Sequence, residues 1–488
     1  MLIQRMHLLK SLQIALITFG ISSLGASIPT YSDISLPVIG DTSSSIVSMQ
    51  KEQEIGAIFL KMLHSQLPTE TDPELVQYIE NLVYRLAEAS QLQNRRLSII
   101  LIDSPYLNAF AAPGGVVGIN TGLFLHAKTE EEFASVIAHE LAHLSQRHYA
   151  RGVEAAQRQT LPTMAALLGS IVLAAAGAGD LGVAALSSTI AGAQSSQLTF
   201  SRTNEQEADR IGILTMVRAS MNPRGMADLF ERMSKMEGTG PQYEFLRTHP
   251  LSRSRVADAR SRAEQYPSYP SRNTREYEQM RNRAVVKMTQ SLDVVRNRFR
   301  QELSSGRTPS EQATRYALAL IELEMQNPKQ AGKVLAPALT KSQGNDLPVQ
   351  ILNNQILFAK GDKKGGIAGM RKLLAGNPGN YPVIMTLADL LHNDGQYKEA
   401  MTILKAESRK RPQDPYIWYL LAETAGLAGD ITGVHTSRAE YFFLVGNMDD
   451  CIQQLEYAME QPKLLFSQKA ALKTRIDEVN AYKKNMKL

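Results

Sequence analysis

The residues beyond position 310 follow a repeat of about 34 residues, and this feature restricts the fold more than any other in the chain. Small residues are followed four positions later by larger apolar residues, in the pairs Ala331 and Leu335, Gly366 and Met370, and Ala400 and Leu404. Stacked pairs of antiparallel helices show this pattern, because small residues lie where two helices cross and larger residues fill the space one turn away. We therefore expect an all-α solenoid over residues 311–488.

The repeat positions resemble the tetratricopeptide repeat. The second unit departs from that pattern, since Asn353 and Asn354 stand where leucine and a small residue are usual. Cys451 occupies a small-residue position in the last unit, so we expect it to fill the core rather than to take part in redox chemistry. A solenoid of this kind offers a concave groove that can recruit partner proteins.

The whole chain has 488 residues, which is too long for one hydrophobic core and predicts two or three domains. Its formal net charge of +5 is spread without a basic run or interleaved aromatic residues, which argues against nucleic-acid binding. A single cysteine excludes an intrachain disulfide, so packing, a metal ion or both must stabilise the fold.

The N-terminus has the features of a secretory signal peptide over residues 1–26. Arg5 and Lys10 precede an uncharged apolar run that ends in the small residues Gly25, Ala26 and Ser27. An uncleaved membrane anchor is the alternative, but serine and glycine interrupt the apolar core and leave it short for a span. We expect cleavage near Ala26 and export of the mature chain.

Residues 27–264 are predicted to form one mostly helical α+β domain with a small sheet. Helical patterns cover 51–66, 73–93, 129–150, a segment from 204 onward and 251–264, and apolar strands are expected at 97–104 and 116–120. The Pro- and Ser-rich stretch QYPSYPSRNT, residues 265–274, suggests a boundary. We assign residues 265–310 to a linker with connecting helices.

Residues 161–201 contain Asp180 as their only charged residue. A buried or self-packed hairpin of helices rich in alanine and glycine explains this composition. A hairpin that touches a membrane or covers a site is the sharper alternative. A pair of membrane-spanning helices is the third, although Gly, Ala and Ser contribute little to membrane transfer.

The segment VIAHELAHLSQRH, residues 136–148, holds three of the nine histidines of the chain. His139 and His143 are four residues apart, which places them about 40° apart around a helix axis and lets both imidazoles reach one point. Two neutral imidazoles suit a borderline metal ion, with zinc as the usual choice. Glu140, beside His139, can take a proton from a water molecule at the metal. His148, beyond this pair, is expected to be structural.

A zinc hydrolase needs a third protein ligand and an open fourth position. The segment NEQEADRIG, residues 204–212, offers Glu205 and Asp209 on one helix face and Glu207 on another. Helical phase alone does not choose between them. If Glu205 binds the metal, Asp209 lies one turn further and can accept the free N–H of a ligand histidine.

Four motifs in order, NAFAAPGGVVGINTGLF, HELAHLSQRH, NEQEAD and THPLSRSR, resemble the M48 metallopeptidase family over about residues 50–262. The resemblance implies a zincin-like peptidase domain that holds one Zn²⁺ per subunit through His139, His143 and Glu205. It also implies that Asp209 supports a ligand histidine and that Glu140 is the general base.

The same resemblance gives His249 and Arg255 catalytic roles. His249 can donate to the developing oxyanion, or it can reach the fourth metal position and inhibit the resting enzyme. Arg255 can contact the transition state or form a structural ion pair. Asn108, Gly114, Gly115 and the strand around 115–119 are expected to hold an extended substrate along a sheet edge, with an ordinary glycine bulge as the alternative.

The expected function is therefore a zinc-dependent endopeptidase. With the repeats and the signal peptide, the resemblance implies a periplasmic enzyme that cleaves unfolded or misassembled proteins, with outer-membrane barrel proteins and their assembly machinery as clients and partners. Peripheral contact with the outer membrane and a chaperone-like role belong to this expectation. The alternative is a non-proteolytic assembly scaffold whose zinc site is held inactive.

Overall fold

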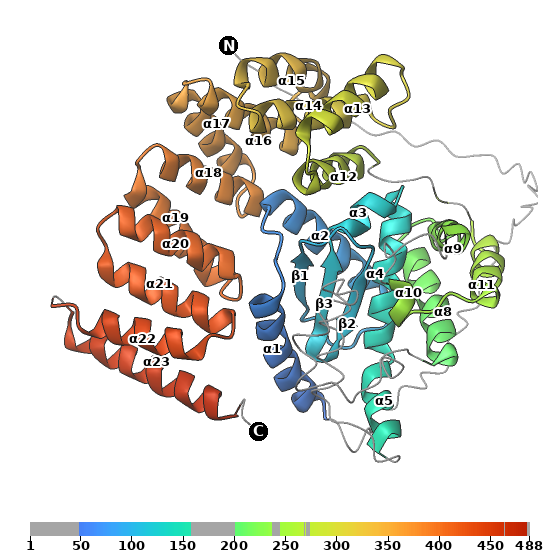
Figure 1. Cartoon of the computed structure of the whole chain (residues 1–488), viewed down its shortest axis with the longest axis horizontal. Coiled ribbons are helices and arrows are strands. Elements are labelled where there is room, and N and C mark those ends of the chain that lie inside the picture. Colours follow the sequence, from blue (N-terminus) through green and yellow to red (C-terminus); the bar gives the residue numbers. More distant parts are fainter. Residues whose placement is uncertain are drawn as a thin grey trace, which may run out of the picture. The chain divides into compact units, whose positions relative to one another are not determined.

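A computed structural model of the protein describes residues 48–157, 201–236, 245–267, 269, 274–462 and 464–485. The expected signal peptide and, apart from Ser201, the segment 161–201 lie outside these residues. Figure 1 shows a helical domain with a small sheet, followed by a succession of helices, which confirms the predicted fold class. Among the described helices, none has both the length and the apolarity needed to cross a membrane.

The N-terminal domain places helices around three short strands. Its elements are α1 (Met49–Gln66), α2 (Pro73–Ala89), β1 (Ser98–Ile102), β2 (Ala109–Ala112), the 3₁₀ turn η1 (Pro113–Gly115), β3 (Val116–Asn120), α3 (Gly122–His126), α4 (Glu130–Ser145), α5 (His148–Gln157), α8 (Arg202–Arg218), α9 (Arg224–Met236), α10 (Phe245–Thr248) and α11 (Arg253–Glu264).

The sheet has the strand order β1-β3-β2. Strand β3 pairs in parallel with β1, with Ile100 opposite Gly118, and antiparallel with β2, with Phe110 opposite Gly118. The strand expected around 115–119 is therefore central and hydrogen-bonded on both sides. It cannot present an edge to a substrate, so that expectation was wrong, and the strand β2 was not foreseen.

Two apolar cores hold the sheet between helices (Figure 1). Phe59 and Leu63 of α1 pack with Ile100, Phe110 and other residues of one sheet face. The larger core joins the other face to α2, α4, α9 and α12 (Thr274–Met288). Helix α4 is buried along nearly its whole length, and Thr129 caps its first turn by accepting a hydrogen bond from the Glu132 N–H.

The single helix expected over 129–150 is broken. Helix α4 ends at Ser145, Arg147 has a left-handed backbone with φ of 50°, and α5 begins at His148. The guanidinium of Arg147 pairs with Glu52 of α1 at 2.9 Å, which holds this strained residue in place. The break changes the direction in which His148 points, because a residue five positions after His143 on a continuous helix would face away from it.

The repeat domain consists of successive helix pairs, as the sequence predicted. They are α14 (Glu311–Glu324) with α15 (Pro328–Ser342), α16 (Leu347–Ala359) with α17 (Lys363–Gly376), α18 (Tyr381–Asn393) with α19 (Tyr397–Lys410), α20 (Pro415–Leu427) with α21 (Ile431–Leu444), and α22 (Met448–Met459) with α23 (Phe466–Asn485). Ala331, Ala388 and Ala400 are fully buried where helices meet, and Cys451 is buried among apolar residues. Gly361, Gly395 and Gly429 end the first helices of three pairs with positive φ.

The segment assigned to a linker, 265–310, contains α12 and α13 (Leu292–Ser304). Tyr277 of α12 lies in the larger core of the N-terminal domain and donates to the Ala127 carbonyl at 2.9 Å. Arg283, further along α12, binds Asp72 at the start of α2 and contacts Tyr316 of the first repeat helix. Helix α12 is thus packed into both domains.

Candidate metal centre

Helix α4 presents His139 and His143 toward one point. The Nε2 atoms of the two rings are 3.0 Å apart, and the side chains are almost completely buried. Val136, Ile137, Ala138, Leu141 and Ala142 of the same helix are buried as well. Two imidazoles this close would be costly to bury without a shared proton or cation.

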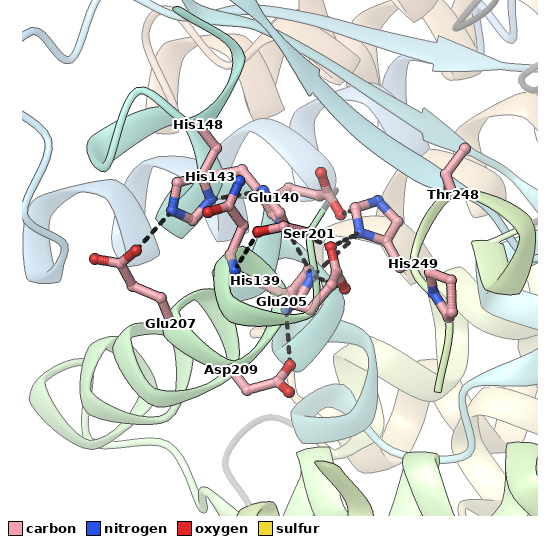
Figure 2. Close-up of polar contacts among 12 residues, drawn as sticks. His139, Glu140, His143, His148, Ser201, Glu205, Glu207, Asp209, Thr248 and His249 are labelled. Atoms are coloured by element: carbon pink, nitrogen blue, oxygen red, sulfur yellow. Dashed lines mark hydrogen bonds and ion pairs between the residues drawn. The ribbon is translucent and has the colours of Figure 1, made fainter. Parts of the chain in front are cut away.

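Helix α8 brings Glu205 to the histidines (Figure 2). Its carboxylate oxygens lie 3.4 Å from His143 Nε2 and 3.5 Å from His139 Nε2. The close packing of α8 on α4 depends on Gly212, because a Cβ there would lie 3.2 Å from the backbone nitrogen of His139 and 3.3 Å from the Ala138 carbonyl carbon. Glu207 instead points to His148, so the geometry groups Glu205 with the histidine pair.

His249 closes the cluster from the opposite side. Its Nδ1 lies 3.0 Å from Glu205 Oε1 and 3.3 Å from His139 Nε2, and its Nε2 lies 3.4 Å from Glu140 Oε1. The ring stacks on Phe245 with 4.5 Å between centroids and is buried. His249 therefore lies between the candidate base and the candidate ligand Glu205.

The donor set fits a divalent transition-metal ion. One ligand atom from each of His139, His143, Glu205 and His249 lies within 4.8 Å of the others, and all four residues are buried. Glu140 Oε1 is buried and, apart from the 3.4 Å approach of His249 Nε2, has no hydrogen-bond partner among the described residues, which fits a carboxylate that can accept a further donor. Nitrogen and carboxylate donors in this number are typical of zinc sites.

Asp209 and Arg255 surround this set. Asp209 Oδ1 lies 3.0 Å from His139 Nδ1, although the ring N–H does not point straight at it. Arg255 donates twice to Asp209, at 2.7 Å each, and its Nη1 lies 2.7 Å from Glu205 Oε2 and from the Pro250 carbonyl. Arg255 thus ties Glu205 and Asp209 of α8 to the loop that carries His249.

The pKa values of the ionisable side chains in the cluster are shifted in different directions. Burial raises the pKa of Glu140 above its usual value, which makes this carboxylate a stronger proton acceptor. Burial lowers the pKa of His143 well below normal and keeps this imidazole neutral. Burial opposes the charged form of Glu205, yet its contacts with His249, His139 and His143 hold its pKa well below normal.

The strand that borders the cluster is not the one that the sequence suggested. The Ala111 N–H of the edge strand β2 donates to Glu140, so β2 is the strand that borders the cluster. Asn108 is buried just before β2. Gly114 and Gly115 form the turn after it with φ of 78° and 81°, and a Cβ on Gly114 would collide with the α1 backbone at Glu52. The two glycines thus form a turn rather than the strand bulge given as the alternative, and their contact with a substrate stays a prediction.

Sequence reasoning missed two residues at this site. His148 was expected to be structural and Glu207 was given no partner, but His148 Nδ1 lies 3.0 Å from His143 Nδ1 and His148 Nε2 lies 3.1 Å from Glu207 Oε2. The signal for this contact was weak, because it depends on the helix break at Arg147, which no glycine or proline announces.

Comparisons with known proteins agree with this arrangement. The model of peptidase family M48 matches residues 73–263, and the tetratricopeptide-repeat model matches residues 357–424. The beta-barrel assembly-enhancing protease of Escherichia coli K12 is 31% identical over 469 residues, covering 95% of this chain and 96% of that protein.

Two further relatives match different shares of this chain. A putative beta-barrel assembly-enhancing protease of Vibrio cholerae is 31% identical over 91% of this chain and 92% of its own length. The mitochondrial metalloendopeptidase OMA1 of Saccharomyces cerevisiae is 30% identical over 48% of this chain and 70% of its own length. The chain therefore belongs to the M48 peptidase family and is a metallopeptidase with C-terminal tetratricopeptide repeats.

Proposed function

We propose that the protein is a zinc endopeptidase in which His139, His143 and Glu205 hold the ion. The observation that carries this proposal is the convergence of two imidazoles and a carboxylate, all buried, beside the acid Glu140. When bound, zinc supplies Lewis-acid chemistry by lowering the pKa of water and polarising a peptide carbonyl. Glu140 takes the proton of the attacking water and passes it to the leaving amine.

An extended substrate would lie along β2. Its outer edge borders the cluster, and backbone hydrogen bonds along an edge bind a peptide with little dependence on side chains. This placement suits an enzyme that acts on unfolded segments of many sequences. Asn108, immediately before β2, would fix the end of that edge.

His249 is proposed to occupy the fourth position in the resting enzyme. Its contacts with Glu140 and Glu205 place the ring where water and a substrate carbonyl must come. A substrate must then displace it, and an oxyanion-donor role is the alternative. His249→Ala should raise cleavage without a change in bound zinc, whereas loss of all activity at unchanged zinc content would support the oxyanion role.

Arg255 is proposed to act as a positioning residue. Its guanidinium is engaged by Asp209, Glu205 and the Pro250 carbonyl, which leaves it directed at the acids of α8 rather than at a substrate. We propose the same supporting role for Asp209 toward His139. Arg255→Lys should therefore weaken metal retention as well as cleavage, because lysine cannot form the paired contact with Asp209.

The cellular role rests on the full-length relatives. Because proteins named beta-barrel assembly-enhancing proteases match over nearly the whole chain, we propose a periplasmic enzyme that removes misassembled outer-membrane barrel proteins. The division into signal peptide (1–26), peptidase domain (27–264), connecting segment (265–310) and repeats (311–488) belongs to this proposal. The repeats would recruit the clients and their assembly machinery. Carbonate extraction of the mature protein would test peripheral membrane contact.

The decisive experiment measures bound zinc and casein cleavage on the same samples of wild type and variants. Glu205→Gln should lose both, and Glu140→Gln should keep zinc and lose about 10²–10⁴-fold in cleavage rate. Glu264→Gln, at an exposed position at the end of α11, is the matched control. A folded wild-type protein that takes up no zinc would refute the proposal. If Glu140→Gln still complements a deletion strain, the scaffold alternative accounts for the biological role.

A further inference from the structure

His143 is linked to a carboxylate through a second histidine, a connection that the zinc-endopeptidase mechanism above does not use. His143 Nδ1 lies 3.0 Å from His148 Nδ1, and His148 Nε2 lies 3.1 Å from Glu207 Oε2 (Figure 2). Arg151 Nη1 approaches the same Glu207 oxygen at 3.2 Å. His148 is completely buried, while Glu207 is partly exposed at 22% of its side chain.

The direction of the hydrogen bonds follows from the position of His143. Its Nε2 faces His139 and Glu205, so this nitrogen must offer a lone pair to a cation held there. The proton of the neutral ring then belongs on Nδ1, which can donate to His148 Nδ1. His148 must accept at Nδ1 and carry its own proton on Nε2, where Glu207 accepts it.

We propose that His148 and Glu207 are positioning residues that fix the tautomer and the ring orientation of the metal ligand His143. They would do for His143 what Asp209 does for His139, with the carboxylate one imidazole further away. Ligand histidines in proteins generally have such a partner on their second nitrogen, and its loss typically weakens metal binding by 10–100-fold. The inference rests on the proposed zinc site.

The break between α4 and α5 allows His148 to contact His143. The left-handed Arg147, held by Glu52, ends α4 and starts α5 so that His148 returns toward His143. Glu207 comes from α8, the helix that also carries Glu205 and Asp209. Helix α8 therefore supplies a direct ligand, the carboxylate beside His139 and the carboxylate that accepts from His148. A purely structural role for His148 would fill the same space but would not require a hydrogen bond at each ring nitrogen.

The test measures the zinc affinity of the full chain by competition with a chromophoric chelator, together with the visible absorption of the Co²⁺-substituted protein. His148→Leu should lower zinc affinity about 10–100-fold and shift the Co²⁺ bands. His148→Asn, whose amide oxygen can replace Nδ1 as acceptor, should recover part of this affinity. Glu207→Gln, at a partly exposed position, should fold in any case and lower affinity by a smaller factor. His435→Leu in α21 is the control and should change neither readout.

The double variant tests whether Glu207 acts through His148. His148→Leu with Glu207→Gln should bind zinc no more weakly than His148→Leu alone. Unchanged zinc affinity and Co²⁺ spectrum in His148→Leu, with only a lower stability of the metal-free protein, would overturn the inference, as would additive losses in the double variant. These outcomes differ from failure of the proposed function, in which the wild type itself binds no zinc.

Discussion

Replacing Arg283 with methionine is expected to destabilise the protein more than replacing Arg411, whose ion pair with Glu80 is partly exposed. Arg283 is 6% exposed and makes two hydrogen bonds of 2.8 Å to Asp72, while its Nη1 lies 3.1 Å from Glu74. The Tyr316 hydroxyl, from the first repeat helix, donates to Glu74 at 2.8 Å. Both carboxylates are about as buried as the arginine.

The magnitude follows from what remains after the substitution. Methionine fills much of the volume but leaves Asp72 and Glu74 buried beside Lys287, whose amino group lies 3.6 Å from Asp72 and whose side chain is 38% exposed. Removing one partner of a buried pair typically costs about 3–5 kcal/mol. The comparison is Arg411→Met, which breaks a contact with Glu80 in which both side chains are about one-fifth exposed. Breaking this partly exposed pair should cost less than breaking the buried one, because solvent can reach the carboxylate that is left.

The assay is urea unfolding followed by the fluorescence of Trp418, the only tryptophan, which lies in α20 of the repeat domain. At an m-value of about 3 kcal/mol per molar urea, the loss in Arg283→Met lowers the midpoint by roughly 1 M or more. Adding Asp72→Asn and Glu74→Gln should restore most of it, because the uncompensated charges are then gone. If Arg283→Met and Arg411→Met cost the same, or if the triple variant is no more stable than Arg283→Met, the argument from buried charge is wrong.

Three further predictions concern other parts of the molecule. Burial lowers the pKa of Lys61 to about 8, and its ammonium lies 3.8 Å from the centre of the Phe443 ring. Because Lys61 in the unfolded chain keeps its proton up to about pH 10.5, the free energy of unfolding should rise between about pH 8 and 10.5. In urea unfolding, Lys61→Met should therefore stabilise the protein by about 1–2 kcal/mol at pH 7 and by little near pH 10, and an equal gain at both pH values would contradict the lowered pKa. Gly212→Val should separate α8 from α4, lower zinc content and casein cleavage together, and cost about 1–3 kcal/mol in stability. Normal zinc content in this variant would show that the close approach of α8 to α4 does not position Glu205. EDTA should stop casein cleavage while the helical circular dichroism remains, and added Zn²⁺ should restore it; cleavage that survives complete metal removal would contradict a metal-dependent reaction.

The local chemistry of the site could be read from the sequence because it depends on spacing within single helices. Four residues of one helix bring His139 and His143 to one point, and the same separation links Glu205 to Asp209. The repeats could also be predicted from the sequence, because each helix pair contacts mainly its neighbours and a regular pattern of small residues marks the positions of those contacts. Within the described residues, no comparable local pattern indicates secretion, the clients or the cleavage preference.

Other features depend on contacts between segments that are distant in the chain, and only the tertiary structure decided them. The strand order makes β2 the edge beside Glu140, a result that no periodicity within residues 109–120 contains. The position of His249 against Glu140, the burial of Arg283 between Asp72 and Tyr316, and the connection from His143 through His148 to Glu207 each join different elements. A sequence pattern records the face that a residue presents along its own element, whereas packing chooses which distant side chain meets that face.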